Sequence, residues 1–156
     1  MTAAQDMKQA RTQWRESGIA LLRCGGLFGA IRISGDLVRT AAGTDNSRKI
    51  DAFLAEALQR GPVFVDLYAQ RYYVLVPVSA GRRYEWAVRR DPEAEFLGRG
   101  CFLGVPRPDR TEPEGVRSYW CVSMDGPGAL AVPDAVSQLL ALARFRRAKA
   151  ERGADE

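Results

Sequence analysis

Histidine is absent from this 156-residue sequence, and its absence excludes several common kinds of active site. Serine or cysteine nucleophiles activated by histidine, proton transfer by imidazole and almost every common zinc site need that residue. Cysteine is scarce too, with three residues at positions 24, 101 and 121 and no CxxC pair. Three isolated cysteines argue against a disulfide framework or a cysteine-only metal site, and favour a reducing cytoplasm. We therefore expect no metal and no cofactor.

Long apolar runs are also missing. No segment approaches the roughly 20 apolar residues that cross a bilayer. The first residues, MTAAQDMKQARTQWRE, are polar and include acids, which is unlike a signal peptide. The composition is that of an ordinary globular protein, with 46% hydrophobic and 27% charged residues. These features predict a soluble cytoplasmic protein that does not engage a membrane.

Among the charged residues, arginine dominates. Of the 23 basic residues 20 are arginine, and the formal net charge is +4. Arginine favours bidentate contacts with phosphate and carboxylate groups, and nucleotide bias in the coding sequence explains the same excess without any function. The mild positive charge is compatible with a polyanionic partner but does not by itself identify one.

The spacing of apolar residues predicts one α+β domain. Residues 1–17 read as a polar N-terminal helical arm anchored by Trp14, residues 18–147 as the α+β domain and residues 148–156 as a flexible tail. Strands are expected at 19–24, 27–33, 63–66, 72–76, 95–97, 101–105 and 117–123. They predict a mixed or antiparallel sheet of five to six strands, with hairpins between 63–66 and 72–76 and between 95–97 and 101–105.

Helical spacing is clearest after Asn46 and after Pro133. One helix starts at Asp45 or Asn46 and ends before Gly61, and a shorter one precedes it at 36–42. The inward-facing residues of the two main helices are predicted to be Ile50, Phe53, Leu54, Ala57 and Leu58, and then Val136, Leu139, Leu140 and Ala143. Two helices should cover one face of the sheet, with the last helix packed alongside. Residues 79–92 fit a loop, a short helix or an edge strand.

Short motifs that suggest catalysis have simpler explanations. The GGLFG run at 25–29 lacks the Lys-Ser/Thr pair of a phosphate-binding loop and leads into a strand, so its glycines are interpreted as a turn. Asp36 reads as the first residue of the next helix. Asp66, Glu95 and Asp109 form no DxD pair within a strand, which favours surface carboxylates over a two-metal site.

Arginine and aromatic residues alternate through the predicted hairpins, and this mixture carries the main functional hypothesis. Arginine binds phosphates, while aromatic rings stack on bases. Cross-strand aromatic packing and a solvated arginine rim explain the same pattern without a ligand. The candidate residues for binding a nucleic acid or nucleotide are Arg71, Arg82, Arg83, Arg99, Tyr73 and Trp86.

Three segments, GPVFVDLYAQRYYVLVP, EFLGRGCFLGVPRPD and RSYW, resemble the bifunctional DNA primase/polymerase (prim-pol) domains of actinobacteria. The resemblance covers roughly residues 27–144 and implies an RRM-like α+β core. It also implies an acidic metal-binding pair on an early strand, where IRISGD offers only Asp36, and a histidine beside the strand that holds Arg71, Tyr72 and Tyr73. Without either, the resemblance implies a catalytically degenerate relative in which Arg71 and Arg99 retain a phosphate-facing role.

These observations favour a non-catalytic binding protein for a nucleic acid or nucleotide, with no catalytic residue assigned. The alternative is a protein-interaction or regulatory module that acts through self-association or a protein partner. Residual primase/polymerase-type nucleotidyl transfer ranks last, because both the histidine and the acidic pair are missing.

Overall fold

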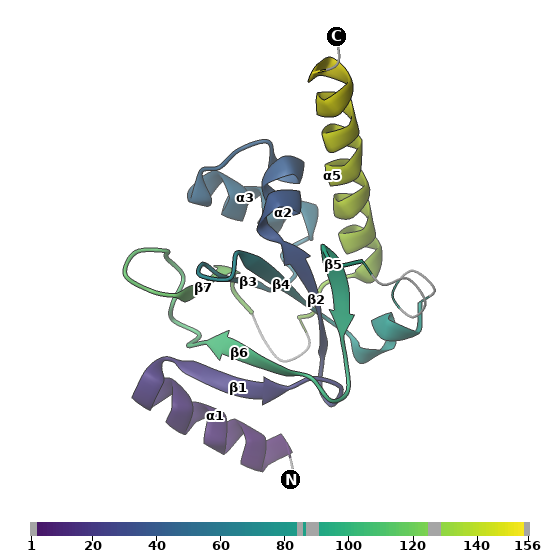
Figure 1. Cartoon of the computed structure of the whole chain (residues 1–156). Coiled ribbons are helices and arrows are strands. Elements are labelled where there is room, and N and C mark those ends of the chain that lie inside the picture. The colour runs from purple at the N-terminus through teal and green to yellow at the C-terminus, as the bar shows by residue number, and fades with distance from the viewer. Residues whose placement is uncertain (1–2, 84–85, 87–90, 125–128, 155–156) are drawn as a thin grey trace.

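Five strands rich in β-branched and aromatic residues form a central antiparallel sheet in the order β5-β2-β4-β3-β7, and β1 and β6 form a separate ribbon (Figure 1). The structure is a computed structural model that describes residues 3–83, 86, 91–124 and 129–154. The strands are β1 (Ile19–Arg23), β2 (Gly29–Ser34), β3 (Val63–Asp66), β4 (Arg71–Val76), β5 (Ala94–Leu97), β6 (Phe102–Pro106) and β7 (Ser118–Val122). The helices are α1 (Ala3–Ser17), α2 (Gly35–Ala42), α3 (Ser47–Ala57) and α5 (Pro133–Ala154), with the 3₁₀ helix η1 (Val78–Arg82). The expected α+β class and antiparallel sheet are confirmed.

Helices α2, α3 and α5 cover one face of the central sheet (Figure 1). This face is apolar because every second residue of the inner strands is apolar, and Ile31, Ile33 and Val74 have no exposed surface. Together with the helices they form the helix-side core. The helix residues that are predicted to face inward and are fully buried there are Ile50, Leu54, Leu58, Val136, Leu139, Leu140 and Ala143. The predicted helical stripes are therefore confirmed, with Phe53 and Ala57 only partly buried against this core.

The opposite face of the sheet is covered by the β1–β6 ribbon and by α1 (Figure 1). Trp14 of α1 packs here, and its Nε1 donates a hydrogen bond to the Val105 carbonyl oxygen at 3.0 Å. The N-terminal helix is thus held against the domain. The buried residues on this side form the ribbon-side core, which consists of Cys24, Ala30, Phe64, Leu75, Leu97, Leu103, Val105 and Trp120.

Side-chain caps fix where the short helices begin. The hydroxyl oxygen of Ser34 accepts from the Leu37 N–H at 3.3 Å, so Ser34 is the N-cap of α2 and Asp36 lies in its first turn. Asn46 caps α3 in the same way, accepting from the Lys49 N–H at 3.0 Å. Helix α2 ends at Gly43, whose φ of +71° is a left-handed conformation that glycine adopts without strain.

The predicted hairpin between residues 95–97 and 101–105 is wrong. β5 pairs with β2, and β6 pairs with β1. The chain from β1 to β2 and the chain from β5 to β6 therefore run side by side from the ribbon into the central sheet. The ribbon is therefore the bent continuation of the β2–β5 ladder. Local periodicity shows that a segment is a strand but not which strand it pairs with, because pairing depends on packing between residues far apart in sequence.

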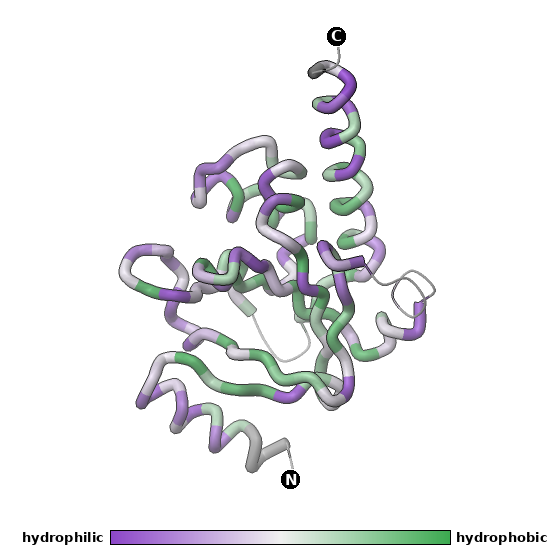
Figure 2. The backbone as a smooth tube through the Cα atoms, in the orientation of Figure 1, coloured by the Kyte–Doolittle hydropathy of each residue, from purple (hydrophilic) through white to green (hydrophobic). Residues whose placement is uncertain are grey.

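Helix α5 continues to Ala154, beyond residue 148 where a flexible tail is predicted. Its C-terminal half extends away from the sheet and carries much hydrophilic sequence (Figures 1 and 2). The segment 79–92 forms η1 up to Arg82, whereas residues 84–85 and 87–90 lie outside the described part of the chain. Among the helices of the described residues, none is both long and apolar enough to cross a membrane.

Candidate functional site

Polar residues gather at one end of the central sheet, where four neighbouring strands begin or end. Ser34 ends β2, Arg71 begins β4, Asp66 ends β3 and Ser118 begins β7. In the antiparallel register Arg71 pairs with both Ser34 and Asp66, and Asp66 pairs with Ser118. The four residues therefore form a continuous row across the sheet.

A second row lies two residues further along the same strands. Tyr73 of β4 pairs with Arg32 of β2 on one side and with Phe64 of β3 on the other. Arg32 in turn pairs with Glu95 of β5. Because side chains two positions apart on a strand share a face, Tyr73 lies on the same face as Leu75 of the ribbon-side core. The ribbon-side face of the sheet is thus apolar at one end and polar at the other.

A cleft of about 330 Å³ opens between this polar end and the ribbon. Its lining residues come from both sheets, with Arg32, Asp66, Tyr73 and Ser118 on the central sheet and Phe102 on β6. The remaining lining residues are Ile19, Leu97, Leu103, Gly104 and Arg117. The cleft exists because the ribbon bends across the sheet and leaves the polar strand ends uncovered.

Two ion pairs place guanidinium groups in the cleft. Arg32 Nη2 lies 2.9 Å from Glu95 Oε2, and Arg117 Nη2 lies 3.3 Å from Asp66 Oδ2. The Arg117 guanidinium also lies over the Tyr68 ring, 5.1 Å from its centroid. Each arginine remains about a third exposed or more, at 36% for Arg32 and 53% for Arg117, so each retains donors for a ligand.

Arg71 lies in the row of strand ends next to the cleft and is not one of the residues that line it. Within the described residues its only side-chain hydrogen bond runs from Nη1 to the Gln70 carbonyl oxygen, at 3.3 Å. Asp66, its register partner, already accepts from the Tyr68 and Ala69 N–H groups and from Arg117. The positive charge of Arg71 is therefore not neutralised by an ion pair with a described carboxylate.

Tyr73 supplies an aromatic surface between these charges. Its ring stacks on Phe64 with centroids 4.9 Å apart and an interplanar angle of 14°. Phe64 also meets Trp120 edge to face at 5.3 Å. Tyr73 is half-buried, and its position on the inner strand β4 is fixed by this packing.

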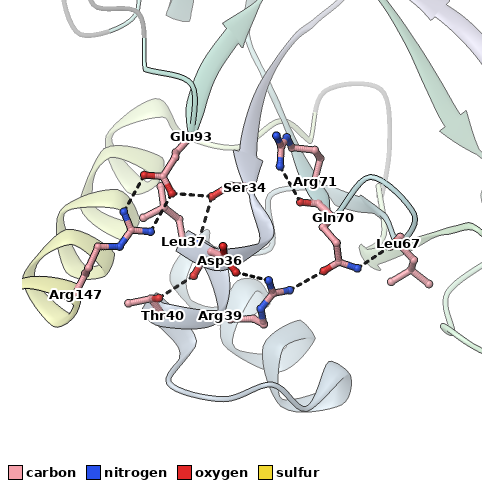
Figure 3. A network of polar contacts seen from close by, with 10 residues as sticks. All are labelled: Ser34, Asp36, Leu37, Arg39, Thr40, Leu67, Gln70, Arg71, Glu93 and Arg147. Atoms are coloured by element: carbon pink, nitrogen blue, oxygen red, sulfur yellow. Dashed lines mark hydrogen bonds and ion pairs between the residues drawn. The ribbon is translucent and has the colours of Figure 1, made fainter. Parts of the chain in front are cut away.

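A hydrogen-bonded network at the start of α2 adjoins the row of strand ends (Figure 3). Glu93 accepts two hydrogen bonds from Arg147 of α5, at 2.8 and 2.9 Å, and one from Ser34 Oγ at 3.3 Å. These contacts, chiefly the hydrogen bonds from Arg147, hold the pKa of Glu93 below its usual range. Glu93 is thus a carboxylate that ties α5 to the sheet and is poorly suited to accept a proton.

The same network fixes the β3–β4 turn. Arg39 donates to Asp36 at 2.6 Å and to the Gln70 side chain at 2.7 Å, and Gln70 donates to the Leu67 carbonyl oxygen at 2.6 Å. Gln70 adopts a positive φ of +56°. Because Gln70 precedes Arg71 and also accepts its hydrogen bond, this network positions the Arg71 guanidinium (Figure 3).

A separate titratable cluster lies on the helix side of the sheet. The Tyr119 hydroxyl donates to the carboxylate of Asp51 in α3, with both oxygens 3.1 Å away. Burial raises the pKa of Asp51, and the pKa of the neighbouring Cys121 and Tyr72 is raised for the same reason. Burial in the helix-side core thus disfavours the charged form of each of these groups.

The sequence-predicted site residues do not converge on one place. Tyr73 lines the cleft and Arg71 lies in the row of strand ends next to it, whereas the other four lie elsewhere. Arg82 is exposed on η1, while Arg83 is ion-paired with Asp134 in the first turn of α5. Trp86 is half-buried against the helix-side core. Its indole N–H is buried and has no acceptor within the described part of the chain.

Arg99 occupies the turn between β5 and β6, in contact range of Gly25. A β-carbon on Gly25 would lie 2.7 Å from the Arg99 Cα. Arg99 lines a hollow of about 550 Å³ with Cys24, Cys101 and Arg23, away from the row of strand ends. Its placement does not join it to Arg71.

The site residues predicted from the sequence do not include Arg32, Asp66 or Arg117, although each lines the cleft. One signal was available for Arg32, because a charged residue between Ile31 and Ile33 must point to the opposite face from the core. The contact between Asp66 and Arg117 depends on the pairing of β3 with β7, which the sequence does not reveal. Among the described residues there is no group of three or more Cys, Asp or Glu side chains that could hold a metal ion.

Comparison of the chain with protein-family models, with curated proteins and with solved structures gave no match. Function is therefore inferred from the geometry and charge of the residues described above.

Proposed function

We propose that this protein binds single-stranded nucleic acid, one nucleotide at a time, in the cleft between the central sheet and the ribbon. The observation that carries the proposal is that Arg32 and Arg117 line the cleft together with Tyr73. Arg71 lies two residues before Tyr73 on β4, in the adjoining row of strand ends. Guanidinium groups bind phosphate oxygens, and an aromatic ring between them offers a surface for a base.

The size and charge of the cleft support this ligand. A volume of about 330 Å³ is at the lower end of the range of small-molecule sites, roughly 300–1,000 Å³, which suits one nucleotide unit and leaves the rest of a strand outside. The carboxylates of Asp66 and Glu95 are engaged by Arg117 and Arg32. An anionic ligand therefore meets excess positive charge from Arg71.

Nucleotidyl transfer is not part of this proposal, although the prim-pol resemblance raises it. Transfer with two metal ions needs carboxylates that converge on ions about 3.5–4 Å apart. In the cleft, Asp66 binds Arg117 and two backbone N–H groups. Glu95 lies three strands away from Asp66, on β5, and binds Arg32. The geometry favours binding without chemistry.

The proposal is tested by fluorescence anisotropy with a labelled single strand of about 12 nucleotides, a length within the usual site sizes for such domains. If three phosphates are contacted, affinity should fall about 20-fold between 50 and 200 mM salt. Arg71→Gln should weaken binding and reduce that salt effect to about 7-fold. Arg60→Gln is the matched control, because Arg60 is exposed and precedes β3, at the opposite end of that strand from Asp66.

Two outcomes would reject the proposal. One is the absence of binding at 50 mM salt. The other is binding that Arg60→Gln weakens as much as Arg71→Gln, because the contact would then be general attraction to a basic surface. A free mononucleotide added as competitor shows whether the cleft recognises a single unit, since it should displace the strand at high concentration.

A second candidate function, self-association, is favoured by the ribbon. Leu21 and Phe102, on β1 and β6, are 59% and 55% exposed, and Leu27 nearby is 67% exposed. Large apolar side chains grouped on one surface are typical of contact sites between proteins. Size-exclusion chromatography with light scattering should then give a mass of about twice 17.2 kDa that returns to 17.2 kDa in Leu21→Lys.

A further inference from the structure

Cys24 and Cys101 lie opposite each other at the bend where the central sheet becomes the ribbon. The last register pair of the ribbon joins Arg23 to Phe102. One residue further, the Cys24 N–H donates to the Cys101 carbonyl oxygen at 2.9 Å. The two cysteines therefore continue the antiparallel register, although they are 77 positions apart in the sequence.

This placement brings the two cysteines within the reach of a disulfide. Opposed residues that exchange both backbone hydrogen bonds in an antiparallel pair have Cα atoms about 5.5 Å apart. Cys24 and Cys101 share one of these two bonds, since the Cys101 N–H donates to the Gly98 carbonyl oxygen. Disulfides most often join Cα atoms about 5.5–6 Å apart. Opposed side chains also share a face, and both cysteines pack with the ribbon-side core.

The two thiols differ in access. Cys24 is 5% exposed, and burial together with the nearby Cys101 raises its pKa to about 11. Cys101 is half-buried and lines the hollow of about 550 Å³ together with Arg23 and Arg99. Cys101 is therefore the thiol that an oxidant reaches first, from a hollow that also has two arginines in its lining.

We propose that Cys24 and Cys101 are a reversible dithiol that a hydroperoxide oxidises to an intramolecular disulfide. The Cys101 thiolate attacks one peroxide oxygen, the O–O bond breaks, and the departing oxygen takes a proton, leaving Cys101 as a sulfenic acid. The Cys24 sulfur then attacks the Cys101 sulfur, the S–O bond breaks and the S–S bond forms. The departing hydroxide takes the Cys24 proton and leaves as water. The two sulfurs lose two electrons, which the peroxide gains.

Such a pair fits the reducing compartment predicted from the sequence. Disulfides of cytoplasmic proteins are usually transient and respond to oxidants. Cys121 provides a contrast within the same chain, because it lies on β7 beside Asp51 in the helix-side core, on the far side of the sheet from Cys24. It should remain a thiol.

Trypsin separates the three cysteines, which makes the test direct. Cleavage after arginine leaves Cys24 in residues 24–32, Cys101 in residues 100–110 and Cys121 in residues 118–144. The wild-type protein is treated with hydrogen peroxide at a small molar excess and then alkylated and digested without reductant. Before alkylation, the intact protein should have lost about 2 Da. The digest should contain peptide 24–32 linked to peptide 100–110, and dithiothreitol should restore both free thiols.

Variants separate the proposal from general oxidation. Cys121→Ser should form the same linked peptide at the same rate, whereas Cys101→Ser should lose it and keep Cys24 as a thiol. Cys24→Ala, in which the buried site keeps an apolar side chain, should instead accumulate sulfenic or sulfinic acid at Cys101. A wild-type protein that gains about 32 Da at one cysteine, links Cys121, forms intermolecular dimers or does not react would overturn the proposal.

Discussion

The two faces of the central sheet are built from the same strands and yet carry different residues. On the helix-covered face Ile31, Ile33 and Val74 are completely buried, and their apolar side chains are those that a hydrophobic core requires. On the ribbon-covered face Arg32 and Tyr73 occupy the alternate positions of the same strands. Core formation accounts for the first set and leaves the charges of the second unexplained, which is why the second face is the better place to look for function.

Within the ribbon-covered face the same contrast repeats on a smaller scale. Toward the bend, Ala30, Leu75 and Leu97 are buried beneath the ribbon and α1. Toward the strand ends, Arg71 and Asp66 stand in register beside an open cleft. One end of this face serves stability and the other remains available to a ligand.

The largest expected effect is a difference in unfolding free energy between substitutions on the two faces. Ile33→Ala removes buried methyl groups between β2 and α2 and should cost about 2–5 kcal/mol of unfolding free energy. Arg32→Ala, the preceding residue, should change it by no more than about 1 kcal/mol, because its ion pair with Glu95 is more than a third exposed. Urea unfolding followed by tryptophan fluorescence measures both. Equal losses would mean that the ribbon-covered face is also a stability element.

A second pair of neighbours compares the faces by binding. Tyr73→Leu removes the ring at the cleft and should weaken binding to a single strand by about tenfold, in line with roughly 1–3 kcal/mol for one stacked base. Tyr72→Phe changes the adjacent residue on the helix side, 7% exposed, and should leave the affinity unchanged. If Tyr72→Phe weakened binding as much, the ligand would not be read by the ribbon-covered face.

The sequence predicted the helix-covered face better than the cleft, and the reason is physical. The stripe Ile50, Leu54 and Leu58 and the alternation of Ile31 and Ile33 are local patterns that report burial directly. The cleft depends on strand partners, since Asp66 and Arg117 meet only because β3 pairs with β7. The ribbon was missed for the same reason.

Among the predicted site residues, the local pattern was informative only along one strand. Arg71 and Tyr73 are two positions apart on β4 and necessarily share a face. Arg82, Arg83 and Arg99 lie in connections whose direction no periodicity fixes, and the structure separates them from the cleft. Composition identified arginine and aromatic residues as a group, but only the fold shows which of them lie near the cleft and which lie elsewhere.

A smaller effect is expected at the boundary between the two faces, where Glu93 joins Arg147. The folded pKa of Glu93 is depressed, so the contact stabilises the protein above the unfolded pKa and the contribution is lost as the pH falls through the folded value. Because the side chains are 38% and 35% exposed, Glu93→Gln should cost only about 0.2–1 kcal/mol at pH 7. Chemical denaturation at pH 7 and pH 3 tests this, and a loss that persists at pH 3 would contradict it.

The smallest effect concerns Asp51 on the helix side, and its sign is opposite. The folded pKa of Asp51 is raised by burial, so the protein is favoured while the carboxyl is neutral and loses stability as the pH rises through the folded value. Asp51→Asn keeps an acceptor for the Tyr119 hydroxyl and removes the charge. The variant should be at least as stable as the wild type at pH 7 and show a flatter stability curve between pH 4 and 7. A marked loss at pH 7 would show that the charged form is required.

The central claim is that the polar end of the ribbon-covered face binds single-stranded nucleic acid. Fluorescence anisotropy with a labelled oligonucleotide, on the wild type, Arg71→Gln and Arg60→Gln, tests it most directly. At 50 mM salt we predict that Arg71→Gln binds a labelled single strand at least tenfold more weakly than wild type, corresponding to about 1.4 kcal/mol for a charge-assisted phosphate contact. Arg60→Gln should bind as wild type does. Equal affinities for wild type and Arg71→Gln, or no binding by either, would contradict the account.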